Sequence, residues 1–178
     1  NRIFYAEGST VTVERLTFCD GTALRGMGLF LTNCNATLAN CAIVSNRFTS
    51  GSQYGMGAGL YAEDGTLTVR DTLIHGNGQF SGGSLHGSGM AAVRVAVSLV
   101  NVHFNTNAVF NTLQNDGYGL GLYLVGGSAS IDNCRFTTNG PINAGRAKYG
   151  GAVYADGVNP LTVTNCRTRG NGSISTTA

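Results

Sequence analysis

The hydrophobic and polar positions of this chain follow one short pattern, which recurs six times at a spacing of about 31 residues. Each unit contains the alternation Leu-x-Val-x-x-(Cys/Thr/Leu/Val)-x-(Phe/Ile), which is typical of short strands separated by a bend. No segment shows the i, i+3, i+4 apolar spacing of a helix. The six units begin at Tyr5, Phe30, Tyr61, about Val93, Tyr123 and Tyr154, the fourth being shortened and the sixth carrying one extra residue.

Such units can bury their apolar faces only by stacking coil upon coil, because the period is too short for a propeller blade. The pattern therefore predicts an all-β chain, a right-handed parallel β-helix of about six coils with loop extensions on one side. Residues 1–178 are expected to form a single domain. The first residues lack the order of a signal peptide, so either a signal has been removed or the chain is a processed piece of a longer protein.

Aligned positions become physical columns when coils stack about 4.8 Å apart. Two columns form the expected core: Phe18, Ile43, Ile74, Phe104 and Phe136, ending at Thr168, and Val13, Leu38, Val69, Leu99, Ile131 and Val163. A third column repeats small residues, with Cys serving as a small hydrophobe: Leu16, Cys41, Thr72, Val102, Cys134 and Cys166. A fourth is aromatic and interrupted at the fourth coil: Tyr5, Phe30, Tyr61, Tyr123 and Tyr154.

Two further columns consist mainly of Asn. One contains Asn40, Asn101, Asn133 and Asn165 with Asp71 interposed, and the other contains Asn46, Asn77, Asn107, Asn139 and Asn171. Asn tolerates the left-handed backbone of a sharp bend, and its amide can bond to the same residue one coil away. We expect both columns to mark corners and to form ladders. The alternative is a ligand or ion site, although amides alone make a poor cation site.

Four Gly-rich and Ser-rich extensions follow the second Asn column. They carry aromatic, amide and basic residues, namely Gln53, Tyr54, Gln79, Phe80, His86, Phe110, Gln114, Arg146, Lys148 and Tyr149. Insertions on one side of a solenoid commonly form its binding face. These residues are candidates for stacking on surface glycans or packing on a protein partner. The alternative is that the extensions simply cover their own β-helix.

Charge and composition exclude several classes of function. Charged residues make up 11% of the chain and the formal net charge is +2, which gives no basic stripe for nucleic acid. No apolar run is long enough for a membrane helix, so we expect no membrane insertion. The five Cys include no CxxC pair. We expect Cys134 and Cys166 to be free thiols, whereas Cys19 and Cys34 are candidate partners for Cys41.

The elements GMGAGLYAE, GYGLGLYL and YGGAVYAD, followed by Ile-x-x-Asn or Phe-x-x-Asn, carry a resemblance to a known family. They resemble the GGA[ILV] and FxxN repeats of chlamydial polymorphic outer membrane proteins. The whole chain is similar to right-handed β-helices of the pectate-lyase-like superfamily. The resemblance implies an extracellular or cell-surface β-helical passenger, often adhesive. The chain contains no autotransporter barrel, and its GGA element is intact only at Gly150-Gly151-Ala152.

Enzymes on this scaffold usually cleave polysaccharides and need clustered carboxylates, with a calcium ion and a basic residue in lyases. The best candidates here are Glu7 and Glu63, which share a column with Thr32 between them, together with Asp64 and Arg70. The three His are scattered and suggest no metal site or catalytic triad. We therefore expect no cofactor, no metal and no enzymatic activity.

Three functions remain open from sequence alone. The first is a non-catalytic extracellular scaffold or fibre subunit. The first and last coils lack a helix or a charged run as a cap. Open strand edges of this kind can pair with a second copy of the chain or with flanking coils of a parent chain. The second is a polysaccharide lyase or hydrolase. The third is a carbohydrate-binding adhesin module that acts through its extensions.

Overall fold

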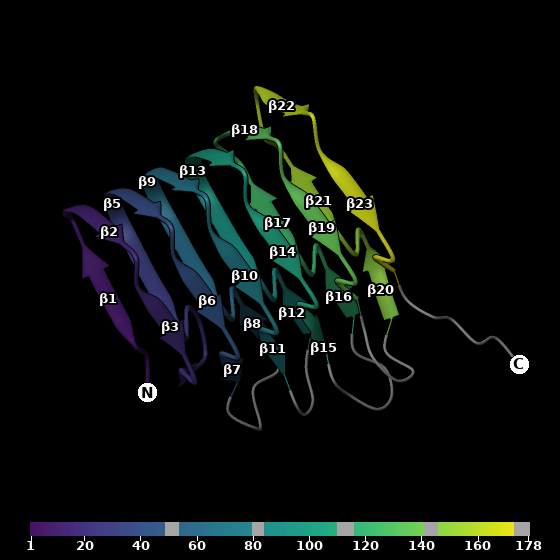
Figure 1. Cartoon of the computed structure of the whole chain (residues 1–178), viewed down its shortest axis with the longest axis horizontal. Coiled ribbons are helices and arrows are strands. Elements are labelled where there is room, and N and C mark those ends of the chain that lie inside the picture. Colours follow the sequence, from purple (N-terminus) through teal and green to yellow (C-terminus); the bar gives the residue numbers. More distant parts are fainter. Residues whose placement is uncertain (49–53, 80–83, 110–115, 141–145, 173–178) are drawn as a thin grey trace, which may run out of the picture.

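The computed structural model is an all-β solenoid in which one coil of parallel strands lies on the next (Figure 1). It describes residues 1–48, 54–79, 84–109, 116–140 and 146–172. We call one coil a level. Every strand pairing between levels is parallel, which confirms the predicted fold class.

The first sheet contains the longest strands and spans six levels. Along the stack it comprises β1 (Phe4–Glu7), β5 (Leu29–Ala39), β9 (Leu60–Arg70), β13 (Met90–Val100), β17 (Leu122–Val125) and β21 (Val153–Asp156). In the outer levels the second half of the coil forms a separate strand, giving β2 (Thr10–Glu14), β18 (Ser128–Asp132) and β22 (Leu161–Thr164).

Three further sheets complete the coils. The second sheet also has six levels: β3 (Thr17–Cys19), β6 (Ala42–Val44), β10 (Leu73–His75), β14 (His103–Asn105), β19 (Arg135–Thr137) and β23 (Arg167–Arg169). The third has four: β4 (Thr22–Ala23), β7 (Arg47–Phe48), β11 (Gly78–Gln79) and β15 (Ala108–Val109). The fourth also has four: β8 (Tyr54–Met56), β12 (Ser84–His86), β16 (Asp116–Tyr118) and β20 (Arg146–Tyr149). The predicted count of about six coils thus applies to two sheets only.

The strand register reproduces the predicted core columns. Phe18 pairs with Ile43, and this column continues level by level to Thr168. Val13 pairs with Leu38, and the second column continues to Val163. These columns fill the space between the first two sheets, where most of the buried hydrophobic residues form one cluster.

The fourth coil differs from its prediction. It was expected to be shortened and to begin near Val93, but β13 has 11 residues, as β5 and β9 have. Ala91 stands in the aromatic column between Tyr61 and Tyr123. The start of the coil was missed because Ala carries none of the aromatic signal that marks the others.

The two Asn columns have different roles. Asn40, Asp71, Asn101, Asn133 and Asn165 all have φ between 50° and 54°, so this column forms the predicted left-handed corner. The Asn residues of the second column do not have a left-handed backbone, so the prediction that they also mark a corner is wrong. The left-handed residues lie one position before the members of this column: Ser45, Gly76, Thr106, Thr138 and Gly170. That bend turns the following Asn side chain into the interior.

The buried Asn side chains form a continuous amide ladder. Asn46, Asn77, Asn107 and Asn139 are fully buried. The backbone N–H and Nδ2 of Asn77 donate to Oδ1 of Asn107 at 3.1 and 3.0 Å, and Nδ2 also donates to the carbonyl of Ile43 at 2.8 Å. The same three bonds recur up to Asn171, so the polar atoms of each amide are satisfied although no water reaches them.

Glycine is required opposite this ladder. A Cβ on Gly89 would lie 2.5 Å from the carbonyl oxygen of Gly121 and 3.0 Å from the Asn107 side chain, closer than real Cβ atoms approach their neighbours. Gly28 and Gly59 are confined in the same way by the next carbonyl and by their own ladder Asn. The recurring Gly-x-Gly-Leu elements are thus the packing partners of the recurring Asn.

Replacing one ladder residue should destabilise the whole stack. Asn107→Ala removes the acceptor of two Asn77 donors, the side-chain donor to the carbonyl of Ile74 and one of the two donors to Oδ1 of Asn139, which keeps the backbone N–H of residue 107. At about 1–3 kcal/mol for each buried unsatisfied group, we expect the free energy of unfolding to fall by about 3 kcal/mol or more. Chemical denaturation measures it.

The matched control is Asn133→Gly, which replaces an exposed Asn at φ 50° with a residue that adopts this conformation freely. We expect a change of about 0.5 kcal/mol or less. Equal losses in the two variants would contradict the ladder's role.

Candidate functional site

The residues proposed for catalysis do not form one cluster. Glu7 and Glu63 share a column with Thr32 between them, as predicted. The Tyr5 hydroxyl donates to the carboxylate of Glu7, whereas Arg70 lies 3.3 Å from Glu14 and 3.6 Å from Asp71. Arg70, the candidate basic residue, and Glu7, a candidate carboxylate, therefore bind different partners.

Arg94, which sequence reasoning missed, neutralises two of the candidate carboxylates. Its Nε lies 2.8 Å from Oδ1 of Asp64 and its Nη2 lies 2.8 Å from Oε1 of Glu63. The same carboxylates raise the pKa of Arg94 further above its usual range, through hydrogen bonds to Asp64 first and Glu63 second. Val93 pairs with Glu63 of the level before, so the next residue, Arg94, lies beside Asp64. A correct alignment of the fourth coil would therefore have revealed Arg94 as the partner of these carboxylates.

The aromatic columns form stacks rather than open platforms. Phe30 lies between Tyr5 and Tyr61, with ring centroids 5.5 and 5.1 Å apart, and Tyr123 stacks on Tyr154 at 5.1 Å. Sugars bind aromatic side chains through the ring face, and here each inner face is covered by the neighbouring ring. Burial, with a hydrogen bond to Glu63, raises the pKa of Tyr61 to about 12.

A second aromatic stack belongs to the fourth sheet. His86 stacks on Tyr118 at 4.7 Å and meets the edge of Tyr123 at 4.9 Å, and Tyr118 lies 5.3 Å from Tyr149. His86 therefore contacts a ring of each aromatic stack. These contacts join the fourth sheet to the first.

The candidate binding residues of the extensions that the structure describes lie in regular strands. Tyr54 lies in β8, Gln79 in β11, His86 in β12, and Arg146, Lys148 and Tyr149 in β20. The described backbone on this side therefore includes strands that continue the stack. Gln53, Phe80, Phe110 and Gln114 lie outside the described residues. The sequence did not reveal these strands because they have only two to four residues each.

A small core also lies on this side of the coil. Met27, Phe48, Ala58, Leu85 and Leu120 form a buried cluster of their own. Phe48 fits only because the facing residue, Gly55, has no side chain: a Cβ there would lie 1.9 Å from its ring. The third and fourth sheets are thus held by packing as well as by backbone pairing.

All five cysteines are free thiols. The expected pairing of Cys41 with Cys19 or Cys34 is wrong: Cys19 is exposed and faces away from the core, and Cys34 and Cys41 are both buried but not bonded to each other. Cys134 and Cys166 are free as predicted, with the Cys134 backbone N–H 3.4 Å from Sγ of Cys166. Burial raises the pKa of Cys134 to about 11.

Basic side chains gather outside the last three levels of the second sheet. His103, Arg135 and Arg167 face outward in one column, and Arg169 lies two residues further along β23. No carboxylate in the described part of the chain forms an ion pair with these three arginines. Arg135 and Arg167 are directly opposed on neighbouring strands, an arrangement that like charges normally disfavour. This arginine face therefore has uncompensated positive charge.

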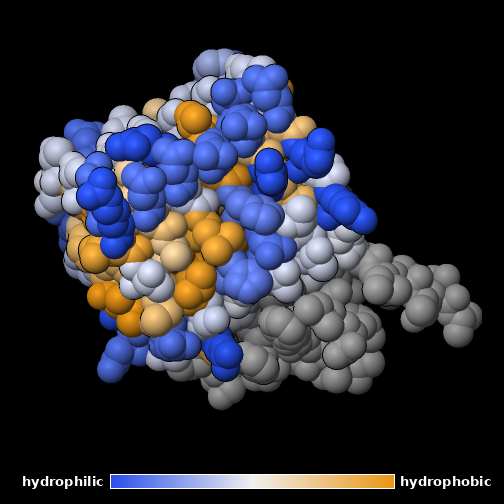
Figure 2. Space-filling view, viewed as in Figure 1, coloured by the Kyte–Doolittle hydropathy of each residue, from blue (hydrophilic) through white to orange (hydrophobic). Residues whose placement is uncertain are grey.

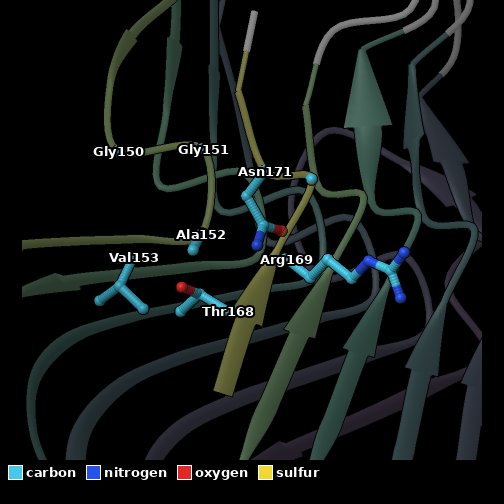
Figure 3. A pocket seen from close by; sticks show the side chains of 8 residues that line it. Gly150, Gly151, Ala152, Val153, Thr168, Arg169 and Asn171 are labelled. Atoms are coloured by element: carbon cyan, nitrogen blue, oxygen red, sulfur yellow. The ribbon is translucent and has the colours of Figure 1, made fainter. Parts of the chain in front are cut away.

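The C-terminal end of the stack has a hollow of about 320 Å³. It is lined by Gly150 to Val153 and by Thr168 to Asn171 (Figure 3). The Asn171 and Thr168 side chains belong to the ladder and core columns, whereas the Arg169 side chain extends away from them. The hollow is the uncovered end of the interior. Within the described ranges no three His, Cys, Asp or Glu gather as metal ligands, and no helix could cross a bilayer.

Comparisons with known proteins identify no relative. No family model matches the chain. No curated protein matches it either, and no solved structure does.

The histidines should make stability depend on pH. Burial lowers the pKa of His86, and burial, with Arg135 and His75 nearby, lowers the pKa of His103. A His with a lowered folded pKa binds fewer protons in the folded state, so its stabilising effect is present above about pH 6.5 and is lost as the pH falls through the folded value. We expect a smaller free energy of unfolding at pH 5 than at pH 7.5.

Denaturation of the double variant His86→Gln/His103→Gln across this pH range provides the test. The substitutions should flatten the pH profile even if they lower stability at every pH. An unaltered slope would show that other groups cause the dependence.

Proposed function

We propose that this chain is a non-catalytic, extracellular structural module whose end levels pair with further parallel coils, either of the same parent protein or of a second copy. The observation that carries the proposal is the change in burial along one core column. Ile131 is fully buried, whereas Val163, its equivalent in the last level, is 53% exposed. A side chain of this type is normally covered, and another coil would cover it.

Both ends of the stack expose hydrophobic side chains in this way. The N-terminal levels expose Ile3, Tyr5, Leu16 and Leu24, and hydrophobic side chains gather at that end in the view of Figure 2. In the last level every residue of β22 and β23 is exposed. Unpaired parallel strand edges beside exposed core residues are a template for strand addition. The surface position rests on the resemblance to GGA[ILV] and FxxN repeats and to pectate-lyase-like β-helices, together with the low content of charged residues.

We do not propose polysaccharide cleavage. Retaining and inverting glycosidases both use two carboxyl groups that flank one bond, one of which must be protonated. Here Glu63 and Asp64 are both bound by Arg94, and Arg70 by Glu14 and Asp71.

A capping substitution should distinguish assembly from a monomeric state. Val163→Lys places a charge at a position that is half exposed in the isolated chain and would be buried in a stack. We expect the unmodified chain to form larger species with rising concentration, and Val163→Lys to stay monomeric. Sedimentation and electron microscopy measure this.

Val100→Lys is the matched control, because Val100 is 42% exposed but lies on the side of the stack. It should assemble as the unmodified chain does. Monodisperse monomers of the unmodified chain at high concentration, or assembly of Val163→Lys, would contradict end-to-end pairing.

Binding of an acidic surface glycan is a second candidate, favoured by the arginine face. Arg135, Arg167 and Arg169 project from one surface without carboxylate partners among the described residues. An extended polyanion lying along the stack would place negative charge between Arg135 and Arg167, which relieves their repulsion.

Retention on immobilised polygalacturonate or heparin tests this candidate. Arg135→Gln/Arg167→Gln should weaken binding about 5- to 30-fold at low salt, at about 0.5–1 kcal/mol for each exposed charge contact. Arg15→Gln/Arg25→Gln removes the same charge elsewhere and should have little effect. Equal losses in the two double variants would point to net charge alone.

A further inference from the structure

The outer face of the first sheet has an unbroken column of hydroxyl groups. Thr12 pairs with Thr37, and the register continues to the last level through residues that all bear a hydroxyl: Thr12, Thr37, Thr68, Ser98, Ser130 and Thr162. The chain has 19 Thr and 12 Ser among 178 residues, so six in one column are not a consequence of composition. Each side chain is exposed or half-exposed.

A second column without charged residues runs beside it, two residues earlier on each strand. Its members are Thr10, Asn35, Thr66, Ala96 and Ser128. Neither column contains a charged residue. The two form a neutral strip along the stack, which we call the hydroxyl face.

The hydroxyl groups of the first column are free to bind an external lattice. Neighbouring levels lie about 4.8 Å apart, too far for one hydroxyl to bond the next directly. Among the residues that the structure describes, none of the six donates or accepts a side-chain hydrogen bond within the protein, whereas Thr66 of the second column donates to Asn35 at 3.0 Å. Each free hydroxyl therefore has to be satisfied from outside.

The spacing matches that of ordered water. Two O–H···O bonds of about 2.75 Å that meet at a tetrahedral angle place second-neighbour oxygens about 4.5 Å apart, which is the repeat within an ice layer. The level spacing of about 4.8 Å differs by about 0.3 Å a step, within the normal range of hydrogen-bond lengths. One water can therefore bridge each pair of adjacent hydroxyls in an arrangement close to that of ice.

Two features make this arrangement rigid and accessible. Threonine in a strand has few χ1 rotamers, so the backbone repeat fixes the position of its hydroxyl and methyl group. A shallow hollow of about 230 Å³ lies on the same face, lined by Ser98, Ser128, Ser130 and Thr162 with neighbouring Ala, Val and Pro side chains. The hollow is wide enough to hold several ordered waters.

From the regular free hydroxyls, their spacing and the hollow beside them, we propose that the hydroxyl face binds the surface of ice. The partner is a neutral crystalline lattice of water. An uncharged strip suits this lattice, whereas charged side chains would order the water around them in a different arrangement. The charged pairs of Glu14, Arg70 and Asp71 lie at the edge of the strip and do not enter it. This inference does not depend on the pairing of the end levels.

Partitioning of the full chain into slowly growing ice tests the proposal, with ice recrystallisation inhibition as a second readout. We expect the unmodified chain to enter the ice and to inhibit recrystallisation. Thr68→Lys and Ser98→Lys each place a charge in the middle of the face and should abolish both effects. Circular dichroism checks that each variant is folded.

Thr17→Lys is the matched control, since Thr17 is exposed on the outer face of the second sheet. It should partition into ice as the unmodified chain does. Exclusion of the unmodified chain from ice, or unchanged partitioning of folded Thr68→Lys, would overturn the proposal. So would a side-by-side dimer lost in Thr68→Lys, because the face would then be occupied by a second copy.

Discussion

A buried amide must find hydrogen-bond partners without water, and this requirement controls the stack. Each ladder Asn satisfies its side chain only if the next level places another Asn in register, since Asn77 bonds to Asn107 and Asn107 to Asn139. The glycine opposite has to leave room for the amide, as Gly89 does for Asn107. A shift of two residues between adjacent levels would keep the apolar alternation but break the amide bonds between those levels, so the amides fix the register that the apolar columns alone would leave adjustable.

Sequence periodicity predicted the interior well because interior residues must repeat at the level spacing. The Phe18 and Val13 columns, the left-handed corner at Asn40 and the buried place of Cys134 all follow from that repetition. Features that depend on a single level were missed. Ala91 replaces an aromatic residue and concealed the start of the fourth coil, and with it the position of Arg94.

The candidate sites were harder to predict than the fold, and for a physical reason. Outward side chains take no part in the stacking, so their identities carry no periodic signal unless the surface itself requires one. Glu7 and Glu63 lie in the expected column, but Arg94, the ionic partner of Glu63, belongs to the fourth level, which was aligned poorly from the sequence. The third and fourth sheets have strands too short to show alternation, and the sequence suggested loops there.

The amide ladder also has a polarity. Each Oδ1 accepts from the N-terminal level, beginning with Gly21, which donates to Asn46, while the backbone N–H and one Nδ2 hydrogen of the same residue donate toward the C-terminal level, up to Asn171. The other Nδ2 hydrogen bonds a backbone carbonyl of the N-terminal level, so only the amide-to-amide bonds have a single direction. Two stacks that continue the parallel pairing join head to tail, with Asn171 of one stack facing Gly21 of the next, where no side-chain amide accepts from it. An assembly built on this contact has no dyad axis and grows as an open, polar filament.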